Sequence, residues 1–289
     1  MAKKLFVMHP ALEAGFVGPD DEIVGTEDLL REILALDMAA PFGPQVEEYL
    51  GRNAQVLCGK LAGIVLVGQA SAASLMLPAL EMMGGLPTIG LMGFGENAGI
   101  LGWLDLAEYR HNVVRPRRRE IPVAQSLYQY FVLDGSGRGL TPVQLTELAG
   151  KLDVGESAIR VLDVNMGQVD FSAPQAGMVE KLLGLGGDLA RGTRLLHLPA
   201  GSGLVAAVMA TTIYGLAESW PKCIRLAKDG DEFHVAEVLD CQDFRQVGTR
   251  LAAEARTSAP AVTFSGDVPD ECRQAITEIA ATHGVAVRG

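Results

Sequence analysis

The stretch HLPAGSGLVAAVMATTIYGLAESWP, residues 197–221, contains no Asp, Glu, Lys or Arg between Arg194 and Glu218. Such a run could cross a membrane, fill a core, or hold a ligand against bare backbone. It divides into a β-like run, a Gly/Ser turn and a helix-like run, whereas a membrane span needs about 20 uninterrupted apolar residues. The stretch LAGIVLVGQASAASLMLPAL, residues 61–80, divides in the same way. Both stretches therefore predict a buried strand, loop and helix, with no membrane partner.

Composition narrows the class of protein. The chain has 289 residues, of which 48% are hydrophobic and 6% aromatic, enough for two ordinary domains with aliphatic cores. Its formal net charge of −11 argues against binding long nucleic acid, which needs a broad basic surface. The four cysteines make no CxxC pair and the five histidines make no HxxxH spacing, so we expect free thiols, no metal and a cytoplasmic location. The apolar run of MAKKLFVMHP is too short for a secretion signal. No GxxxxGK[ST] sequence is present, so we do not expect a Walker-type nucleoside triphosphatase. We also expect no cofactor.

Two copies of one pattern follow each other along the chain. One begins with LFVMHP at Leu5 and the other with YFVLDG at Tyr130; each continues through a Pro-Gln pair, an apolar stretch and a proline-initiated strand. The copies close on GWLDLAEYR (102–110) and AEVLDCQDFR (236–245). Five matches in one order predict a tandem duplication. The matched residues are Pro44-Gln45 with Pro174-Gln175, Pro87 with Pro221, Asp105 with Asp240, and Arg110 with Arg245.

We therefore predict an α/β protein made of two tandem Rossmann-like three-layer domains with mostly parallel sheets, related by a pseudo-two-fold axis. The boundaries are 1–113 for the first copy, 114–126 for a linker, 127–255 for the second copy and 256–289 for a strand-helix-strand extension. The extension is expected to pair with the second sheet or to cover an edge. Helices with Thr caps are predicted at 26–36 and 141–152.

Ligands of such folds bind beyond the carboxyl ends of the strands, near a helix N-terminus. The first copy places GQAS (68–71) there, and the second places PAGSG (199–203). Glycine lets the backbone approach a ligand, free N–H groups can hold an anion, and serine adds a hydroxyl. The alternative is that both loops are tight strand-to-helix turns. The candidate ligand residues in these loops are Gly68, Gln69, Ser71, Gly201, Ser202 and Gly203.

Four further side chains are candidate ligand contacts. His9 follows the first strand, and Asp134 follows the matching strand of the second copy, where it could orient a ligand hydroxyl. Arg110 and Arg245 end the closing strands, and each is either a phosphate contact or half of a surface ion pair. His197 lies within a strand and is more typical of a buried histidine with satisfied hydrogen bonds.

Three other motifs have weaker meanings. GFGENAG (93–99) imitates a dinucleotide loop, but the matched place in the second copy, AKDGDEF (227–233), is a hairpin-like turn, so we predict no dinucleotide site. GSGRG (135–139) indicates a flexible loop that could fold over a ligand. RPRRR (115–119) is either a solvated linker or a basic rim for an anionic ligand.

The second copy resembles a family of small CRISPR-associated ancillary proteins of the Csx type. Their pattern is a strand ending in a Leu-Pro turn, a small-residue helix ending in Gly, an aromatic-Pro pair before IRL, and a close ending in Q-x-[FV]-R. In the first copy, Leu86 replaces the aromatic residue and Gly90-Leu91 stand where Ile-Arg would be. The matching residues are Leu198-Pro199, Gly215, Trp220-Pro221, Ile224-Arg225-Leu226 and 237–245, with VLDVNMGQVDFSAPQ (161–175) fitting the middle region.

The resemblance implies binding of cyclic oligoadenylate, the second messenger of type III CRISPR antiviral defence, either to sequester it or to cleave it as a ring nuclease. Such rings are rotationally symmetric, and a tandem duplication builds a two-sided site within one chain. We therefore expect the ligand at the interface of the halves, with phosphates on loop N–H groups, Arg110 and Arg245. Cleavage would need no metal, because the ligand's own 2′-OH can attack the adjacent phosphate. No catalytic residue can be named, so sequestration is favoured.

Two other classes of function stay open. A scaffold without a small ligand, which could assemble into a homo-oligomer, would explain why the loops carry so little charge. An enzyme acting on a nucleotide metabolite is the other alternative.

Overall fold

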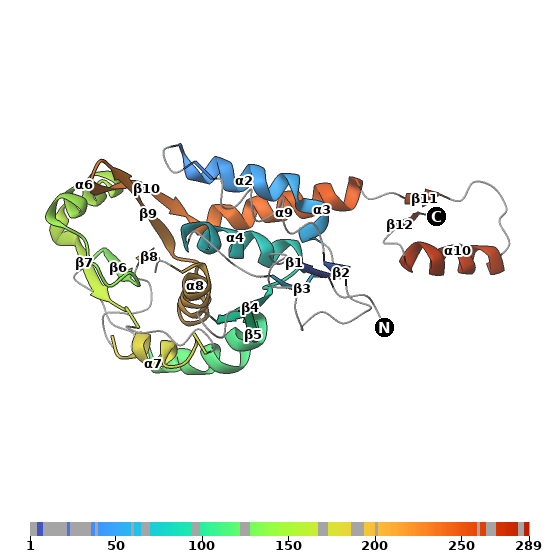
Figure 1. Ribbon diagram of the computed structural model, residues 1–289, viewed down its shortest axis with the longest axis horizontal. Helices are drawn as coiled ribbons and strands as arrows, with labels where there is room; N and C mark the ends of the chain where they lie inside the picture. The colour runs from blue at the N-terminus through green and yellow to red at the C-terminus, as the bar shows by residue number, and fades with distance from the viewer. Residues whose placement is uncertain are drawn as a thin grey trace.

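The structure is a computed structural model (Figure 1). It describes residues 5–7, 22–23, 36–37, 40–58, 61–64, 70–93, 99–121, 128–166, 173–185, 194–199, 202–258, 261–263, 270–282 and 286–288. The chain is a mixed α/β protein with mostly parallel sheets, which confirms the α/β part of the predicted fold class. The helix predicted at 26–36 lies outside the described residues apart from its last position.

Two five-stranded sheets form the framework. The first has the order β2-β1-β3-β4-β5 and the second the order β7-β6-β8-β9-β10, so matched strands occupy matched places. In each sheet only the last strand is antiparallel. This is the doubly wound order 2-1-3-4-5 with a reversed final strand. The strands are β1 (Leu5–Val7), β2 (Glu22–Ile23), β3 (Leu61–Ile64), β4 (Thr88–Gly93), β5 (Gly99–Asp105), β6 (Tyr130–Asp134), β7 (Ile159–Asp163), β8 (Arg194–Leu198), β9 (Lys222–Asp229) and β10 (Glu232–Asp240).

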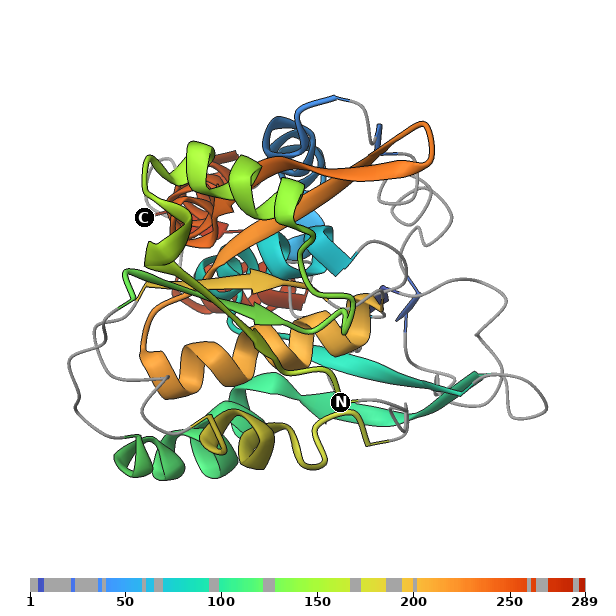
Figure 2. The same ribbon diagram turned by 90° about the vertical axis from the view of Figure 1, so that its left-hand side faces the viewer.

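The two apolar stretches that dominate the sequence form the central helices, α4 (Ala70–Met83) and α8 (Gly203–Ala217). Nearly every residue of α8 is buried, as expected of a helix that is hydrophobic on all sides. α4 and α8 pack against each other in the middle of the molecule (Figures 1 and 2). None of the described helices is both long and apolar enough to cross a membrane.

The helix that follows each closing strand packs against the central helix of the other half. α9 (Cys241–Ser258) lies on α4, while η3 (Tyr109–Val114), which continues α5 (Leu106–Glu108), lies on α8. Glycines permit both close approaches. A Cβ added at Gly248 of α9 would lie 2.3 Å from the Ala79 carbonyl oxygen, and one at Gly215 of α8 would lie 2.6 Å from Val114 Cγ1. The halves are therefore joined reciprocally.

Shorter helices cover the outside of this framework. α6 (Pro142–Leu152) begins with a capping box, in which Thr141 Oγ1 accepts from Gln144 N–H at 3.2 Å and Gln144 Oε1 accepts from Thr141 N–H at 3.0 Å. The predicted Thr cap at this helix is confirmed. The remaining elements are α2 (Phe42–Arg52), α3 (Ala54–Leu57), η4 (Arg115–Glu120), η5 (Glu156–Ala158) and α7 (Met178–Leu183).

Two sequence predictions need correction here. Arg110 and Arg245 do not end strands: β5 ends at Asp105 and β10 at Asp240, so the arginines lie in η3 and α9. The start of the predicted linker, 114–126, is helical through η4 as far as Glu120, because the arginine run continues the turns of η3. Within η4, Arg117 and Arg118 form ion pairs with Glu180 and Glu218, so this run is not simply a solvated linker.

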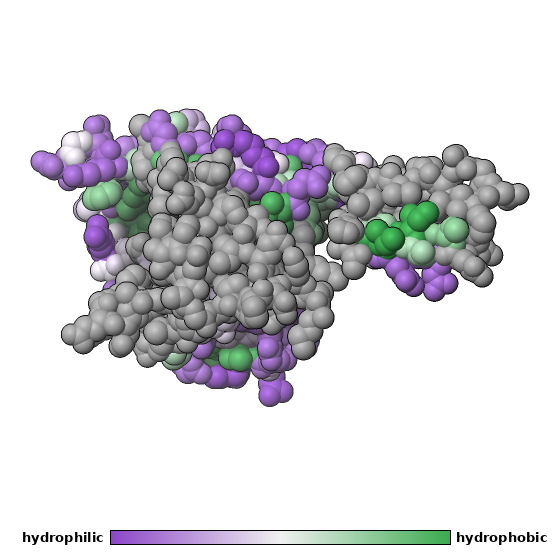
Figure 3. All heavy atoms as spheres, turned by 45° about the vertical axis from the view of Figure 1, so that its right-hand side comes forward, coloured by the Kyte–Doolittle hydropathy of each residue, from purple (hydrophilic) through white to green (hydrophobic). Residues whose placement is uncertain are grey.

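The C-terminal extension builds its own small unit of β11 (Ala261–Thr263), α10 (Asp270–Thr282) and β12 (Ala286–Arg288). β11 and β12 pair in parallel with each other, so the predicted pairing with the second sheet is wrong for these strands. Figure 1 places the unit at the end of the molecule away from β6–β10, and Figure 3 shows apolar side chains on its surface. Ile279 of α10 is 60% exposed. The four cysteines are free, as predicted.

Candidate functional site

A cleft of about 740 Å³ opens at the carboxyl ends of β6 and β8. In the second sheet, the chain runs from β6 to β7 on one side and then returns to place β8 on the other side. This reversal is the topological switch point, where open α/β sheets bind their ligands. The cleft therefore lies where the fold predicts a binding site.

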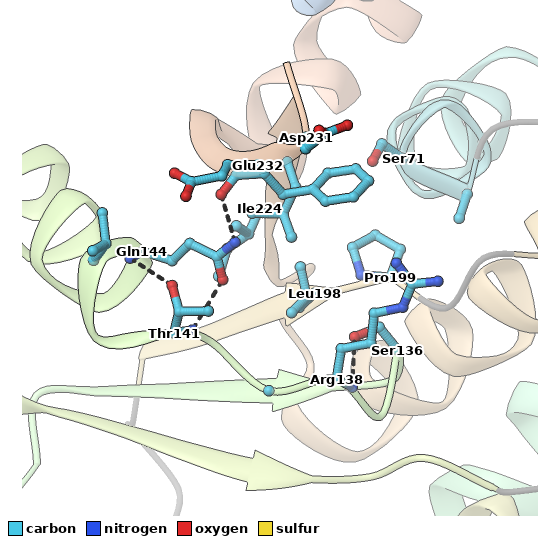
Figure 4. Close-up of a pocket in the computed structure, with 15 residues that line it drawn as sticks. Ser71, Ser136, Arg138, Thr141, Gln144, Leu198, Pro199, Ile224, Asp231 and Glu232 are labelled. Atoms are coloured by element: carbon cyan, nitrogen blue, oxygen red, sulfur yellow. Dashed lines mark hydrogen bonds between the residues drawn. The ribbon is translucent and has the colours of Figure 1, made fainter. Parts of the chain in front are cut away.

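Both halves of the chain line this switch-point cleft (Figure 4). Its floor is apolar and comes from β8 and β9. The start of α4, which belongs to the first half, adds Ser71 to the wall, and the loop after β8 adds Pro199. Ser71 and Pro199 are described members of the GQAS and PAGSG stretches, so the structure brings one residue of each to the same cleft. The floor residues are Leu198, Ile224 and Leu226.

The loop after β6 is shaped by Asp134, whose side chain is buried beneath it. One carboxylate oxygen accepts from Ser136 N–H at 2.9 Å and Ser136 Oγ at 2.6 Å, and the other accepts from Gly139 N–H at 2.7 Å. Gly137 and Gly139 both have a φ of +70°, which favours glycine. The GSGRG loop is thus ordered around Asp134. Asp134 therefore positions this loop, and its side chain is only 2% exposed.

Arg138 extends from this ordered loop toward Pro199 (Figure 4). Its guanidinium forms no ion pair or hydrogen bond with the residues that the structure describes, although its backbone N–H donates to Ser136 Oγ at 3.2 Å. Arg138 is the one cation among the described lining residues, and Asp231 and Glu232 of the β9–β10 hairpin carry opposite charge. The cleft can therefore hold a mainly apolar ligand with one anionic group.

Gln144 forms the wall opposite Arg138. Its Nε2 donates to the Phe233 carbonyl at 2.7 Å, so the side chain ties α6 to the β9–β10 hairpin. Together with the capping box described above, this bond uses both ends of the amide. Phe233 is 43% exposed and borders the cleft, which adds an aromatic surface available to a ligand.

Arg110 and Arg245 lie elsewhere, at the junction of the two halves. Arg110 Nη1 bonds Glu81 Oε1 at 2.6 Å, and Arg245 Nε forms a longer ion pair with Glu81 Oε2 at 3.4 Å. Tyr214 Oη and Trp220 Nε1 also donate to this carboxylate, each at 3.2 Å. Of the two predicted roles, the structure shows the ion pair, and it places neither arginine in the cleft.

The aromatic residues of this junction support the ion pairs. The rings of Tyr214 and Trp220 stack with centroids 4.4 Å apart, and the Arg110 guanidinium lies 4.8 Å from the Tyr214 ring centroid. Burial raises the pKa of the Tyr214 phenol, and the charge of Glu81 raises it further. The phenol therefore stays protonated and donates to Glu81.

His197 is completely buried in β8, between its neighbours Leu133 and Cys223. The expected hydrogen bonds are not found: neither ring nitrogen has a partner among the described residues. Burial lowers the pKa of His197 to about 3, so the imidazole is neutral at physiological pH. Cys223, its neighbour on β9, is also completely buried, and burial raises the pKa of the Cys223 thiol to about 12.

The remaining predicted residues are divided between described and undescribed parts. Ser202 stands at the N-cap of α8 without a side-chain capping bond, and Gly203 begins the helix. The predictions for His9, Gly68, Gln69 and Gly201 lie outside the described residues. In the described part of the chain, no group of three or more His, Cys, Asp or Glu side chains could hold a metal ion.

Sequence reasoning missed three lining residues with clear roles, Arg138, Thr141 and Gln144. A signal for them was present, because a Gly-rich loop followed by a Thr-Pro helix start comes directly after the first strand of the second copy, which is one side of the switch point. The chain matches no protein-family model, and no curated protein is significantly similar to it. The resemblance to Csx-type proteins therefore stays an interpretation of the residues quoted above.

Proposed function

We propose that this protein binds a small nucleotide ligand in the switch-point cleft, and that cyclic oligoadenylate is the ligand class. The observation that carries the proposal is the cleft itself, which lies at the carboxyl ends of β6 and β8 and is completed by Ser71 from the other half of the chain. The choice of cyclic oligoadenylate rests on the sequence resemblance.

The proposal treats the chain as two Rossmann-like units fused in tandem. Its support is the shared strand order of the two sheets and the reciprocal packing of α9 on α4 and of η3 on α8. A fused pair of this kind can present two related surfaces to one symmetric ligand. Sequence divergence between the halves then makes the two surfaces unequal.

The described lining suits one adenine nucleotide. A purine can pack on Leu198, Ile224 and Leu226, while the Asp231 or Glu232 carboxylate can accept from its amino group. Arg138 can meet the phosphate, with the hydroxyls of neighbouring serines as further donors. A cleft of about 740 Å³ lies within the usual range of small-molecule sites, roughly 300–1,000 Å³, and we expect it to hold one nucleotide of the ring.

The same lining favours binding without cleavage. Arg138 is the one cation among the described lining residues, and an arginine side chain stabilises negative charge rather than serving as a general acid. The carboxylates of Asp231 and Glu232 belong to a hairpin on another side of the cleft. We therefore expect sequestration, with the ligand released chemically unchanged.

One observation favours a second candidate function. The described lining carries two carboxylates and a single cation, a balance that suits a neutral nucleoside better than a ligand with several phosphates. On this alternative, the protein binds or transforms a nucleoside metabolite in the same cleft.

Calorimetry with cyclic tri-, tetra- and hexa-adenylate, adenosine and AMP separates these functions, with mass spectrometry of each mixture afterwards. The matched variants are Arg138→Ala in the cleft and Arg119→Ala, an exposed arginine of η4. We expect a ring to bind, to be recovered intact, and to bind at least about tenfold more weakly to Arg138→Ala alone. Adenosine binding without ring binding would move the assignment to the nucleoside candidate, and binding of none of them would contradict both.

A further inference from the structure

A second cleft, of about 500 Å³, lies where β5, α5 and η3 meet α7, and it shares no described lining residue with the switch-point cleft. Its apolar part includes Trp103, Leu104 and Tyr109. Leu104 and Tyr109 come from the end of the first sheet and the helix that follows it. This junction cleft plays no part in the function proposed above.

The other half of the chain contains a matching junction that is filled. At the 135-residue spacing of the repeat, Leu104 matches Leu239 and Tyr109 matches Phe244. There the start of α2 covers the surface: a Cβ added at Gly43 would lie 3.3 Å from Leu239 Cδ2 and 3.8 Å from Phe244 Cζ. The neighbouring Phe42 is completely buried. The start of α2 therefore covers this junction, whereas the described residues at its counterpart leave the junction cleft open.

The filled junction also shows which polar groups such a place accepts. The Phe42 N–H at the beginning of α2 donates to the Glu237 carboxylate at 2.9 and 3.1 Å, and the Arg225 Nε donates to the same carboxylate at 2.6 Å. Arg225 also lies 5.5 Å from the Phe42 ring centroid. At this junction, the Glu237 carboxylate therefore accepts from N–H donors that lie beside an aromatic ring.

The hollow junction offers acceptors without the matching donors. The Glu108 carboxylate has no hydrogen bond or ion pair within the described residues, and Gln175 Oε1 is buried without a partner there. Glu180 forms an ion pair with Arg117 at 3.0 Å, and no Lys or Arg is found among the described residues that line the cleft. Its charge is therefore complementary to a cation, and its aromatic walls suit an apolar body.

We propose that the junction cleft binds a small organic ammonium ion that carries an apolar or aromatic body. The ammonium group would sit near Glu108 and Gln175 Oε1, and the body would pack on Trp103 and Leu104. This inference does not depend on the switch-point cleft or on its ligand.

The test uses the full chain and two probes of nearly equal shape, phenethylammonium and 2-phenylethanol. The binding of each is measured by calorimetry and by the fluorescence of Trp103. We expect phenethylammonium to bind about tenfold more tightly than the alcohol, since only the ammonium can pair with a carboxylate. A Trp103→Phe variant should lose the fluorescence change that accompanies binding, which locates the probe.

Two matched variants decide whether the carboxylate matters. Glu108→Gln keeps the shape of an exposed residue and should weaken phenethylammonium binding several-fold, while 2-phenylethanol binding should not change. Asp243→Asn alters the residue that matches Glu108 in the filled half and should have no effect. Equal binding of the two probes, equal affinity in the two variants, or no saturable binding at millimolar concentration would each overturn the proposal.

Discussion

Replacing Glu81 should weaken the packing of the two halves against each other, because this one carboxylate accepts hydrogen bonds or ion pairs from side chains of both halves. Its side chain is 13% exposed, and those of Arg110 and Arg245 are 21% and 30% exposed. Breaking a buried ion pair by removing one partner costs about 3–5 kcal/mol. Because both arginines reach some solvent, we expect Glu81→Ala to lower the free energy of unfolding by about 3 kcal/mol, at the low end of that range. Glu81→Gln keeps one acceptor oxygen and should cost about half as much.

The assay is urea unfolding followed by the fluorescence of Trp220, which is buried and donates to Glu81. Glu48→Ala is the control, since the Glu48 carboxylate is 69% exposed and lies 3.9 Å from Arg52 on the same helix. With a slope of about 1–3 kcal/mol per molar urea, the Glu81→Ala midpoint should fall by 1 M or more, and salt should change the difference little. An effect of Glu81→Ala within about 0.5 kcal/mol of the control would refute the reasoning.

Three other predictions follow from burial and close contact. Gly248→Ala puts a Cβ 2.3 Å from the Ala79 carbonyl oxygen and should cost about 1–3 kcal/mol, whereas Gly150→Ala in α6, with nothing within 4 Å, should gain about 0.5–1 kcal/mol in the same urea assay. Burial lowers the pKa of His197 from 6.5 to about 3 on folding, so the unfolded state takes up a proton first as the pH drops. The free energy of unfolding therefore decreases as the pH falls from about 6.5 to about 3. Between pH 7 and 5 the natural chain should lose about 2 kcal/mol more than His197→Leu, and equal losses would contradict this. Asp134→Ala removes the acceptor of the 135–139 loop, so hydrogen exchange of the Gly139 amide should accelerate more than tenfold; unchanged exchange would mean that the loop holds its shape without Asp134.

The elements that sequence predicted well are those fixed by local pattern. The strand-turn-helix reading of 197–221 is confirmed by β8 and α8, because an apolar run divided by Gly and Ser can bury all its sides only inside an α/β layer. The Thr141 cap is confirmed because a capping box is complete within four residues. Such features need no knowledge of the rest of the chain.

The features that sequence missed depend on partners far away in the chain. Arg110 meets a carboxylate 29 residues earlier and Arg245 meets the same one across 164 residues, so no local pattern marks Glu81 as their shared partner. The role of Asp134 in ordering its loop was also missed, because the turn that brings the loop N–H groups to its carboxylate depends on positive φ angles at Gly137 and Gly139. The predicted burial of His197 is confirmed, but its ring nitrogens lack the hydrogen bonds that a buried polar group usually makes, within the described residues.

The junction of the halves also shows why positions matched by the predicted repeat carry different residues. At the 134-residue spacing that relates Pro87 to Pro221, Glu81 of α4 matches Gly215 of α8. A Cβ at Gly215 would lie 2.6 Å from Val114 Cγ1 and 3.2 Å from Arg110 Cγ, so a second carboxylate has no room there. One central carboxylate serves both arginines, and the matched position must stay small for η3 to approach α8. An assembly of two identical halves would have to place either two glutamates or two glycines at this junction. Two glutamates would clash with η3, and two glycines would leave both arginines without an acceptor. Because both halves belong to one chain, each half can contribute a different residue to this junction.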